Sequence, residues 1–350
     1  MKNLKSILFQ SFKAAIGFNI FTIVLAIFYI LVVEQYARPF NFKLAVEFGT
    51  AVSGLKIFDT ADTANFRISP SWLVVESKFS FFIPAAEFRA DSKYQSPRLQ
   101  EWCKTRNCCA HRMAYNDNRR LNFKCFTIDD WFINNSNFLD PFYQGVAMIP
   151  LDNFLKSLPK GSRVIINEPL VFFQQHKLNF AIFEKWVVGL AAKHPHLNFQ
   201  VGIQFHFQWL DLQFLALSDG VLFSQLAQFF RQHKIPWGIS EFSTYDRVWR
   251  RRLITPFNKS SDRGKLISQI EFFVPDRLRR AVVLHQAYWI HREAVRSGAN
   301  FIVEWGNFPL IWFSHEIDSD YRSTFALFDW DGKPLPMYWA IARGIADGKR

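Results

Sequence analysis

Short apolar runs alternate with longer helical patterns along the chain after residue 45, and this alternation constrains the fold more than any other feature. Runs typical of buried strands lie within 45–52, 66–76, 108–115, 164–166, 198–207, 235–240 and 300–305. Segments with helical spacing lie at 96–106, 178–194, 222–233, 277–297 and 336–346. Strands that alternate with helices form βαβ units and a parallel sheet. About 300 residues of this pattern predict an α/β fold, a (β/α)8 TIM barrel.

The rest of this region narrows the class of parallel sheet. No glycine-rich phosphate loop follows the first predicted strand, which argues against a dinucleotide-binding sheet. Residues 117–160 are less regular and are expected to form an elaborated loop region. Of the 350 residues 49% are hydrophobic, which is enough for one large core.

An uncharged apolar run precedes the predicted barrel. It covers residues 14–33, and Asn19 is its only strongly polar member. A helix of this length spans about 30 Å, which is the thickness of the hydrocarbon core of a bilayer. Lys2, Lys5 and Lys13 precede the run, so the positive-inside bias places the N-terminus in the cytoplasm.

This run has three interpretations. A buried core helix is disfavoured because the segment is apolar on every face. A cleaved signal peptide is disfavoured because the run is longer than a usual apolar region and no small-x-small site follows it. The sequence therefore favours a single-pass signal anchor, with the barrel in the periplasm or outside the cell. The expected parts are a cytoplasmic basic tail (1–13), a transmembrane helix (14–33), a tether (34–45) and the barrel (46–350).

The basic charge and the cysteines indicate the compartment and the partners. The net charge of +12 comes from small clusters of arginines and lysines, without zinc-finger spacing or an RNA-binding aromatic motif, so no nucleic-acid partner is expected. Four cysteines leave three alternatives open: disulfides in an oxidising compartment, a zinc site without the usual C-x2-C pairs, or reduced thiols. The four are Cys103, Cys108, Cys109 and Cys125.

Two of the predicted strands run directly into a glutamate. Glu168 follows the strand at 164–166, and Glu241 follows the strand at 235–240. In such barrels the chemistry is located at the C-terminal ends of the strands. Cleavage of a glycosidic bond needs two carboxyl groups on either side of that bond, and two strand-end glutamates can supply them. A single strand-end glutamate is more often structural, so the pair carries the prediction.

Other strand-end side chains have the chemistry of a sugar site. Gln204 and His206 are two residues apart, and a strand therefore presents both on one face. His111 and Trp305 are placed at the ends of two further predicted strands. Hydrogen-bonding groups next to an indole suit a ligand with hydroxyl groups and apolar C–H faces.

These residues resemble the motifs of glycoside hydrolase family ten, the endo-β-1,4-xylanases, over most of residues 46–345. Asn167-Glu168 is similar to the strand-four Asn-Glu of the family, and Gln204-Phe205-His206 to its strand-six Gln-x-His. Ser240-Glu241 resembles the end of its strand seven. The further matches are Ala110-His111, Trp305-Gly306, the indole of Trp312, the closing LFDWDGKPLPMYWAI, and VESKF at 75–79 with Lys78.

The sequence also departs from the family pattern. Val75 stands where the resemblance leads us to expect a sugar-binding Asn, and Tyr115 stands in the place of a Trp. The two strand-eight indoles are one residue closer together than expected. The stretch between Glu168 and Gln204 is short, as if one βα unit had been trimmed. These departures concern sugar contacts more than the carboxylates.

The resemblance implies a retaining hydrolase of a β-1,4-linked, xylan-like polysaccharide. Glu241 is then the nucleophile and Glu168 the acid/base, with His206 orienting Glu241 and no metal or cofactor required. The remaining substrate-binding residues are Lys78, His111, Asn167, Gln204, Trp305 and Trp312. Two alternatives stay open: a glycan-binding pseudoenzyme, motivated by Val75, and a membrane-tethered hydrolase of a polysaccharide that the cell exports.

Overall fold

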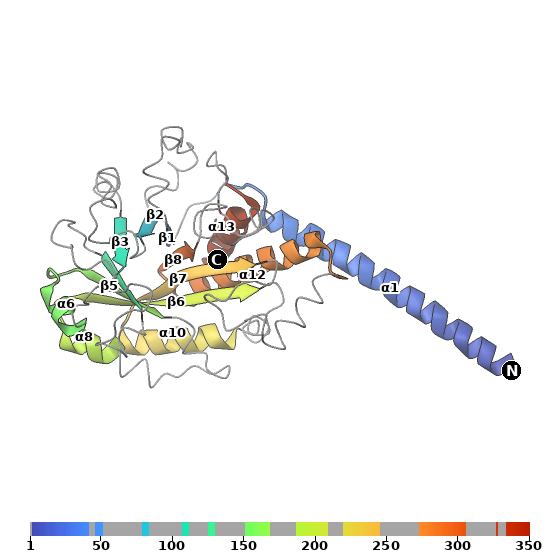
Figure 1. Cartoon of the computed structure of the whole chain (residues 1–350), viewed down its shortest axis with the longest axis horizontal. Coiled ribbons are helices and arrows are strands. Elements are labelled where there is room, and N and C mark those ends of the chain that lie inside the picture. Colours follow the sequence, from blue (N-terminus) through green and yellow to red (C-terminus); the bar gives the residue numbers. More distant parts are fainter. Residues whose placement is uncertain are drawn as a thin grey trace, which may run out of the picture.

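The protein is described here by a computed structural model. It describes residues 2–41, 46–51, 79–83, 107–111, 125–129, 151–168, 187–208, 220–245, 273–305, 327 and 334–350. Within this part of the chain, the main body is a barrel with a long helix attached to one side (Figure 1).

Eight parallel strands close into a barrel in chain order, each paired with the next and the last with the first. This confirms the predicted (β/α)8 architecture. The strands are β1 (Glu47–Ala51), β2 (Phe79–Ile83), β3 (Asn107–His111), β4 (Cys125–Asp129), β5 (Arg163–Glu168), β6 (Asn198–Gln208), β7 (Trp237–Tyr245) and β8 (Phe301–Trp305).

Two strands and one helix lie where the sequence analysis did not place them. β4 and the helix α6 (Leu151–Ser157) fall inside 117–160, which was expected to be an elaborated loop region, so that prediction was wrong for these residues. β2 was also not predicted. Each of the two strands is stabilised by pairing with neighbours on both sides, and this pairing cannot be seen in the local sequence. The strand predicted at 66–76 and the helix at 96–106 lie outside the described residues.

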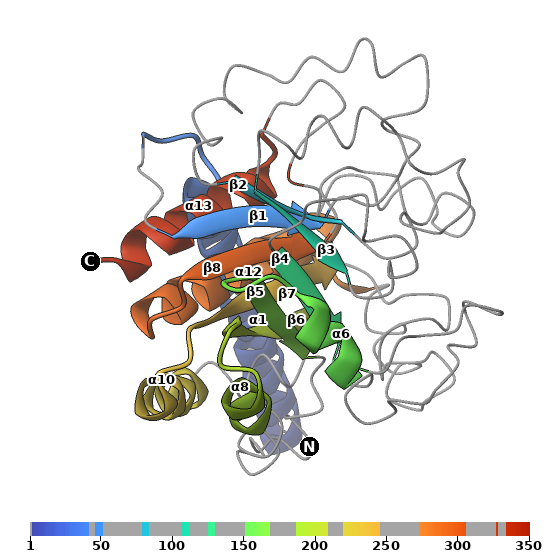
Figure 2. The same ribbon diagram turned by 90° about the vertical axis from the view of Figure 1, so that its left-hand side faces the viewer.

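Helices cover the outside of the barrel (Figure 2). Besides α6 they are α8 (Gly189–Lys193), α10 (Val221–His233), α12 (Asp276–Arg296) and α13 (Pro336–Gly348). The helices α10, α12 and α13 agree with the predicted ones to within two residues. α12 and α13 pack closely because Gly344 has no side chain: a Cβ there would collide with the carbonyl oxygen of Tyr288.

The inside of the barrel is filled at the N-terminal ends of the strands. Ile165, Phe301 and Val303 form a small buried cluster, separate from the large core between the strands and the outer helices. The guanidinium carbon of Arg163 lies 5.0 Å from the centre of the Phe301 ring, and Arg163 Nε donates to Gln200 Oε1 at 2.8 Å. These side chains form a floor, so the opposite end, the rim, is the part of the barrel available for a site.

The helix α1 (Lys2–Tyr36) contains the apolar run. Its part Gly17–Tyr36 has a mean hydropathy of 2.2 and is long and apolar enough to cross a membrane, and only 6% of it is buried. The segment 34–45, expected as a tether, begins inside this helix. Val33 is 1% exposed and belongs to the large core, and Tyr36 and Phe40 pack against that core.

One of the three cysteine alternatives is decided for Cys125. This residue is disulfide-bonded and partly buried against the floor cluster at the start of β4. Reduced thiol and zinc ligation are therefore wrong for this position, and a disulfide is typical of a protein in an oxidising compartment. The other three cysteines are not assigned.

Candidate active site

The backbone places most of the predicted site residues in the C-terminal half of their strands. His111, Glu168 and Trp305 are the last residues of β3, β5 and β8. Gln204 and Glu241 lie further inside β6 and β7. His111, Asn167, Glu168, His206 and Trp305 are described through their backbone alone, and Lys78 and Trp312 lie outside the described residues.

The pleat of β6 decides which side chains face the barrel interior. The Phe205 ring lies 5.8 Å from the ring of Phe223 on α10, so Phe205 points outward. Side chains alternate along a strand, and Gln204 therefore points inward, as Gln200 does at the floor. Gln204 is 7% exposed. By this alternation Gln204 lines the inner face of the barrel.

A β-bulge in β7 sets the position of Glu241. Ile239 and Phe242 both belong to the core under the outer helices, although strict alternation would put them on opposite faces. Two residues of β7, Ser240 and Glu241, therefore lie between Ile239 and Phe242, where a regular strand has one. The pairing registers shift at this point both with β6 and with β8. Bulges often re-aim a side chain next to an active site, and this one puts Glu241 in register with Gln204.

Glu241 and Gln204 are therefore neighbours on adjacent strands, about 4.8 Å apart in backbone spacing. Glu241 is 9% exposed. His206, which was predicted to orient Glu241, is in register with Ser243, two residues nearer the rim. Gln204 thus has the closer backbone position to the carboxylate.

Gly202 makes room for the bulge. A Cβ at this position would lie 2.6 Å from Ser240 Oγ and 3.0 Å from Ile165 Cγ2, and closer still to Ser240 Cβ. Ser240 is 3% exposed, and its hydroxyl oxygen has no hydrogen-bond partner among the described residues. The small residue on β6 therefore allows the side chain of the extra residue of β7 to point into the barrel.

We expect Gly202→Ala to destabilise the barrel by about 1–3 kcal/mol, because the added methyl group overpacks the interior and Ser240 Cβ moves only with its backbone. The free energy of unfolding by urea measures this effect. Gly17→Ala is the matched control, since an added Cβ there meets nothing within 4 Å. Equal unfolding energies for the two variants would contradict the packing described here.

Two buried polar pairs hold α12 against the strands that carry the site. Thr244 Oγ1 donates to Gln286 Oε1 at 2.6 Å. His291 Nε2 lies 2.8 Å from Glu304 Oε1, and these two side chains are 0% and 3% exposed. The His291 ring also lies 4.6 Å from the ring of Phe242, the residue after Glu241. None of these residues was predicted from the sequence. The sequence feature that points to this buried pair is the single acidic residue, Glu304, of the otherwise apolar β8, FIVEW.

The hydrogen bonds of His291 define its proton pattern. Its Nδ1 donates to the carbonyl oxygen of Ala287 at 2.6 Å, because a carbonyl can only accept. Burial raises the pKa of the Glu304 carboxyl, and His291 partly opposes this effect. Burial therefore shifts the Glu304 carboxyl toward its protonated form, in which it can donate a hydrogen bond to His291 Nε2.

The structure also shows where the chain differs from the family pattern. Glu168 ends the fifth strand of this barrel, whereas the Asn-Glu it resembles is on strand four. Glu168 is in register with Ile203, and Gln204 with Glu241, so the two glutamates lie on strands either side of β6. The short stretch noted between Glu168 and Gln204 corresponds to the direct succession of β5 and β6. Among the described residues, no group of three or more metal-ligating side chains is present.

Comparisons with known proteins give a fold and no closer relationship. No protein-family model matches the chain. A search of curated proteins also finds no match. Among solved structures, a GH10 endoxylanase retrieved from a sugarcane soil metagenome superposes with a TM-score of 0.53 at 11% identity, over 85% of this chain and 96% of that one.

Two further solved structures overlap with most of this chain. Xylanase 10B from Thermotoga maritima has a TM-score of 0.47 at 10% identity and covers 89% of this chain and 96% of its own. Xylanase B from Clostridium stercorarium F9 has a TM-score of 0.49 at 12% identity, with 85% and 96% covered. The metagenomic endoxylanase, with its higher TM-score, shows that this chain has a GH10-like (β/α)8 fold.

Proposed function

We propose that this protein is a retaining glycoside hydrolase that cleaves a β-1,4-linked, xylan-like glycan. The observation that carries the proposal is the bulge in β7, which places the buried Glu241 beside Gln204 inside a closed barrel. Glu168 ends a strand two positions around the barrel from β7. Two glutamates on opposite sides of one strand are a suitable source for the pair of carboxyl groups that glycoside cleavage needs.

The chemistry proceeds in two displacements. Glu241 attacks the anomeric carbon while Glu168 donates a proton to the leaving oxygen, and a glycosyl-enzyme ester forms. Glu168 then removes a proton from water, which attacks the same carbon and releases Glu241. Two strand spacings separate the backbones by about 10 Å. Glu168 is in register with the outward-facing Ile203, so the proposal requires its side chain to turn over the end of β5 toward the barrel axis. Only then do the two carboxyl groups reach the separation of roughly 5–5.5 Å that retention requires.

The substrate contacts follow from the same resemblance. Asn167 and His111 are assigned to sugar hydroxyls, and Gln204 contacts Glu241 or the bound sugar from the adjacent strand. Trp305, Trp312 and Lys78 are assigned to the flanking sugars. No metal or cofactor takes part in this scheme.

We further propose that α1 anchors the protein in a membrane with its N-terminus in the cytoplasm and the barrel in the periplasm or outside the cell. The apolar length of α1 and the lysines before it support this topology. The disulfide at Cys125 independently supports an oxidising compartment for the barrel.

The test is mechanism-based labelling. A 2-fluoro-xylobioside with a good leaving group should form a stable ester, and peptide mapping by mass spectrometry should locate it on Glu241. Glu241→Gln should remain unlabelled under the same conditions. An adduct on another residue would overturn the assignment of the nucleophile.

A glycan-binding protein without hydrolytic activity is the second candidate, and Val75 in the place of a sugar-binding Asn favours it. Binding of xylo-oligosaccharides measured by calorimetry, without labelling and without reducing-sugar release, would establish it. Hydrolysis that is lost in Glu241→Gln would exclude it.

A further inference from the structure

The helix α12 packs against both the barrel and α1, so its direction shows at which end of the barrel α1 lies. Along β7 toward the rim, Phe242 contacts His291, and Thr244 then contacts Gln286. Thr244 is nearer the rim than Phe242, and its partner Gln286 is nearer the N-terminus of α12 than His291. α12 therefore runs antiparallel to the strands, and its first turn lies on the rim side of the barrel.

The last turns of α1 are fixed to that same end of α12. Glu34 accepts two hydrogen bonds from Arg277, from Nε at 2.8 Å and from a terminal nitrogen at 2.9 Å. Arg277 is nine residues before Gln286 (286 − 277), which places it about 13 Å beyond the level of Thr244 in the direction of the rim. The ion pair is thus located past the described end of β7.

A stripe of side chains on the last turns of α1 and just after it packs on the barrel, so the two parts are not joined by a free tether. The stripe consists of Tyr29, Val33, Tyr36 and Phe40, whose spacing of three or four residues places them on one side of the chain. Tyr29 Oη hydrogen-bonds to His285 Nδ1 at 2.9 Å. Tyr36 stacks on Tyr288 with ring centres 4.2 Å apart, and Phe40 lies under the Arg343 guanidinium at 3.8 Å.

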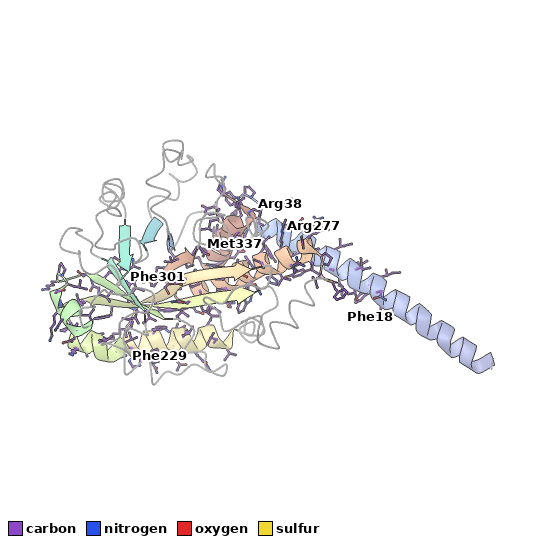
Figure 3. All side chains as sticks on the ribbon, viewed as in Figure 1. Phe18, Arg38, Phe229, Arg277, Phe301 and Met337 are labelled. Carbon is purple, nitrogen blue, oxygen red and sulfur yellow. The ribbon has the colours of Figure 1, made fainter. Side chains whose placement is uncertain are left out.

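The direction in which α1 leaves the barrel is visible in the figures. In Figure 1, α1 extends to the side toward which the arrowheads of β6 and β7 point. In Figure 3, Arg277 and Phe18 lie on that side, while Phe301 of the floor lies toward the opposite end. The exposed apolar part of α1 therefore continues outward from the rim and away from the floor.

The barrel also lies close to the point where the apolar surface of α1 ends. Leu31 is 51% exposed and is the last large exposed hydrophobic residue of the helix. Only three residues separate it from Glu34, about 4.5 Å along the axis. Phe273, just before α12, is 81% exposed at the same end of the barrel. An exposed aromatic side chain and a neutralised carboxylate both suit a position at the membrane interface.

We propose that the rim of the barrel, which carries the candidate active site, faces the membrane that anchors the protein, and that the substrate is a β-linked glycan chain held at the surface of that membrane. The proposal rests on the glycosidase function and on the membrane anchor proposed above. If the rim faces the lipid headgroups, a large polysaccharide from outside the cell cannot easily reach the active site. A glycan chain that is attached to a lipid, or that is being exported through the membrane, can reach it.

The orientation can be measured without any substrate. A fluorophore is introduced through an unnatural amino acid at Gln225 or at Gln232 of the full chain in nanodiscs, with an acceptor dye on the lipid headgroups. The two glutamines are exposed on one face of α10, and their separation of seven positions corresponds to about 10 Å along the helix. Gln225 is nearer the rim, because Phe223 contacts Phe205 and Phe230 stacks on Trp237 at the start of β7.

We expect stronger energy transfer from position 225 than from position 232. Equal transfer, or stronger transfer from 232, would overturn the orientation. This result does not depend on catalysis, so it separates the orientation from the proposed glycosidase function.

The substrate class is tested with the full chain in phosphatidylcholine vesicles. A short β-1,4-xylo-oligosaccharide coupled to phosphatidylethanolamine should be cleaved at least about tenfold faster than the free oligosaccharide at the same total concentration, because both partners share one surface. The Tyr36→Ala/Phe40→Ala variant keeps the anchor and the site but loosens the docking, and it should lose most of this preference.

Three results have distinct meanings. Equal rates on the lipid-linked and free substrates would overturn the membrane-held substrate. An unchanged preference in the loosened variant would overturn the role of the fixed orientation. No cleavage of either substrate, together with the expected energy transfer, would count against the glycosidase function and leave the orientation established.

Discussion

Glu241→Gln is expected to lower kcat/KM on xylo-oligosaccharides by about 10⁴-fold or more. Both displacements in the proposed mechanism pass through this carboxylate, and an amide neither attacks the anomeric carbon nor leaves from it. The substitution keeps the size of the side chain within the bulge of β7. Steady-state hydrolysis of an aryl xyloside, followed by the absorbance of the released phenol, measures the effect.

Glu293→Gln is the matched control for this prediction. Glu293 is 9% exposed, as Glu241 is, but it lies on α12 and pairs with Arg292 at 2.9 Å, away from the inner face of the barrel. We expect its activity to stay close to that of the parent protein. A similar loss in both variants would show that a buried glutamate matters for folding, and it would remove the support for Glu241 as the nucleophile.

The sequence predicted those parts of the barrel whose signal is local. β6, β8, α10, α12 and α13 have apolar runs or helical repeats in their own sequence, and the structure has them close to the predicted residues. Length does not explain why β2 and β4 were missed, because β1, β3 and β8 also have five residues. β2 and β4 are stabilised by pairing with the strands on both sides, which the local sequence does not show. The prediction of an eight-stranded barrel was right, although two of its strands, β2 and β4, were not predicted.

The candidate site was predicted as a set of positions and not as a geometry. Glu241 and Gln204 were both singled out, but a bulge arises from pairing with two other strands and leaves no mark in the local sequence. The docking of α1 was not predicted for a related reason. Tyr29 and Tyr36 are ordinary residues for a membrane helix and its flank, and their packing on α12 depends on tertiary contacts.

The buried pair of His291 and Glu304 is expected to have a large effect on stability. His291→Leu removes the hydrogen bond between a buried carboxyl group and the imidazole, and we expect a loss of about 1–3 kcal/mol in the free energy of unfolding. Glu304→Gln should cost far less, because the amide can donate to His291 Nε2 as the protonated carboxyl does. Urea unfolding of the full chain in mild detergent compares the variants. The double variant His291→Leu/Glu304→Leu should regain much of the stability, since neither polar side chain of this pair is then buried without the other.

The pH dependence distinguishes a protonated Glu304 from a permanent ion pair. Burial raises the pKa of Glu304 in the folded protein above its ordinary value, so the folded state binds more protons than the unfolded state in the interval between the two values. The stability contributed by this group is complete below the ordinary carboxyl pKa and falls as the pH rises through the raised pKa. The parent protein should therefore lose stability relative to Glu304→Gln as the pH increases across this interval. The parent protein could instead gain stability relative to Glu304→Gln over the same interval. That result would mean that the ionised carboxylate is the favoured form and that a charged pair joins β8 to α12.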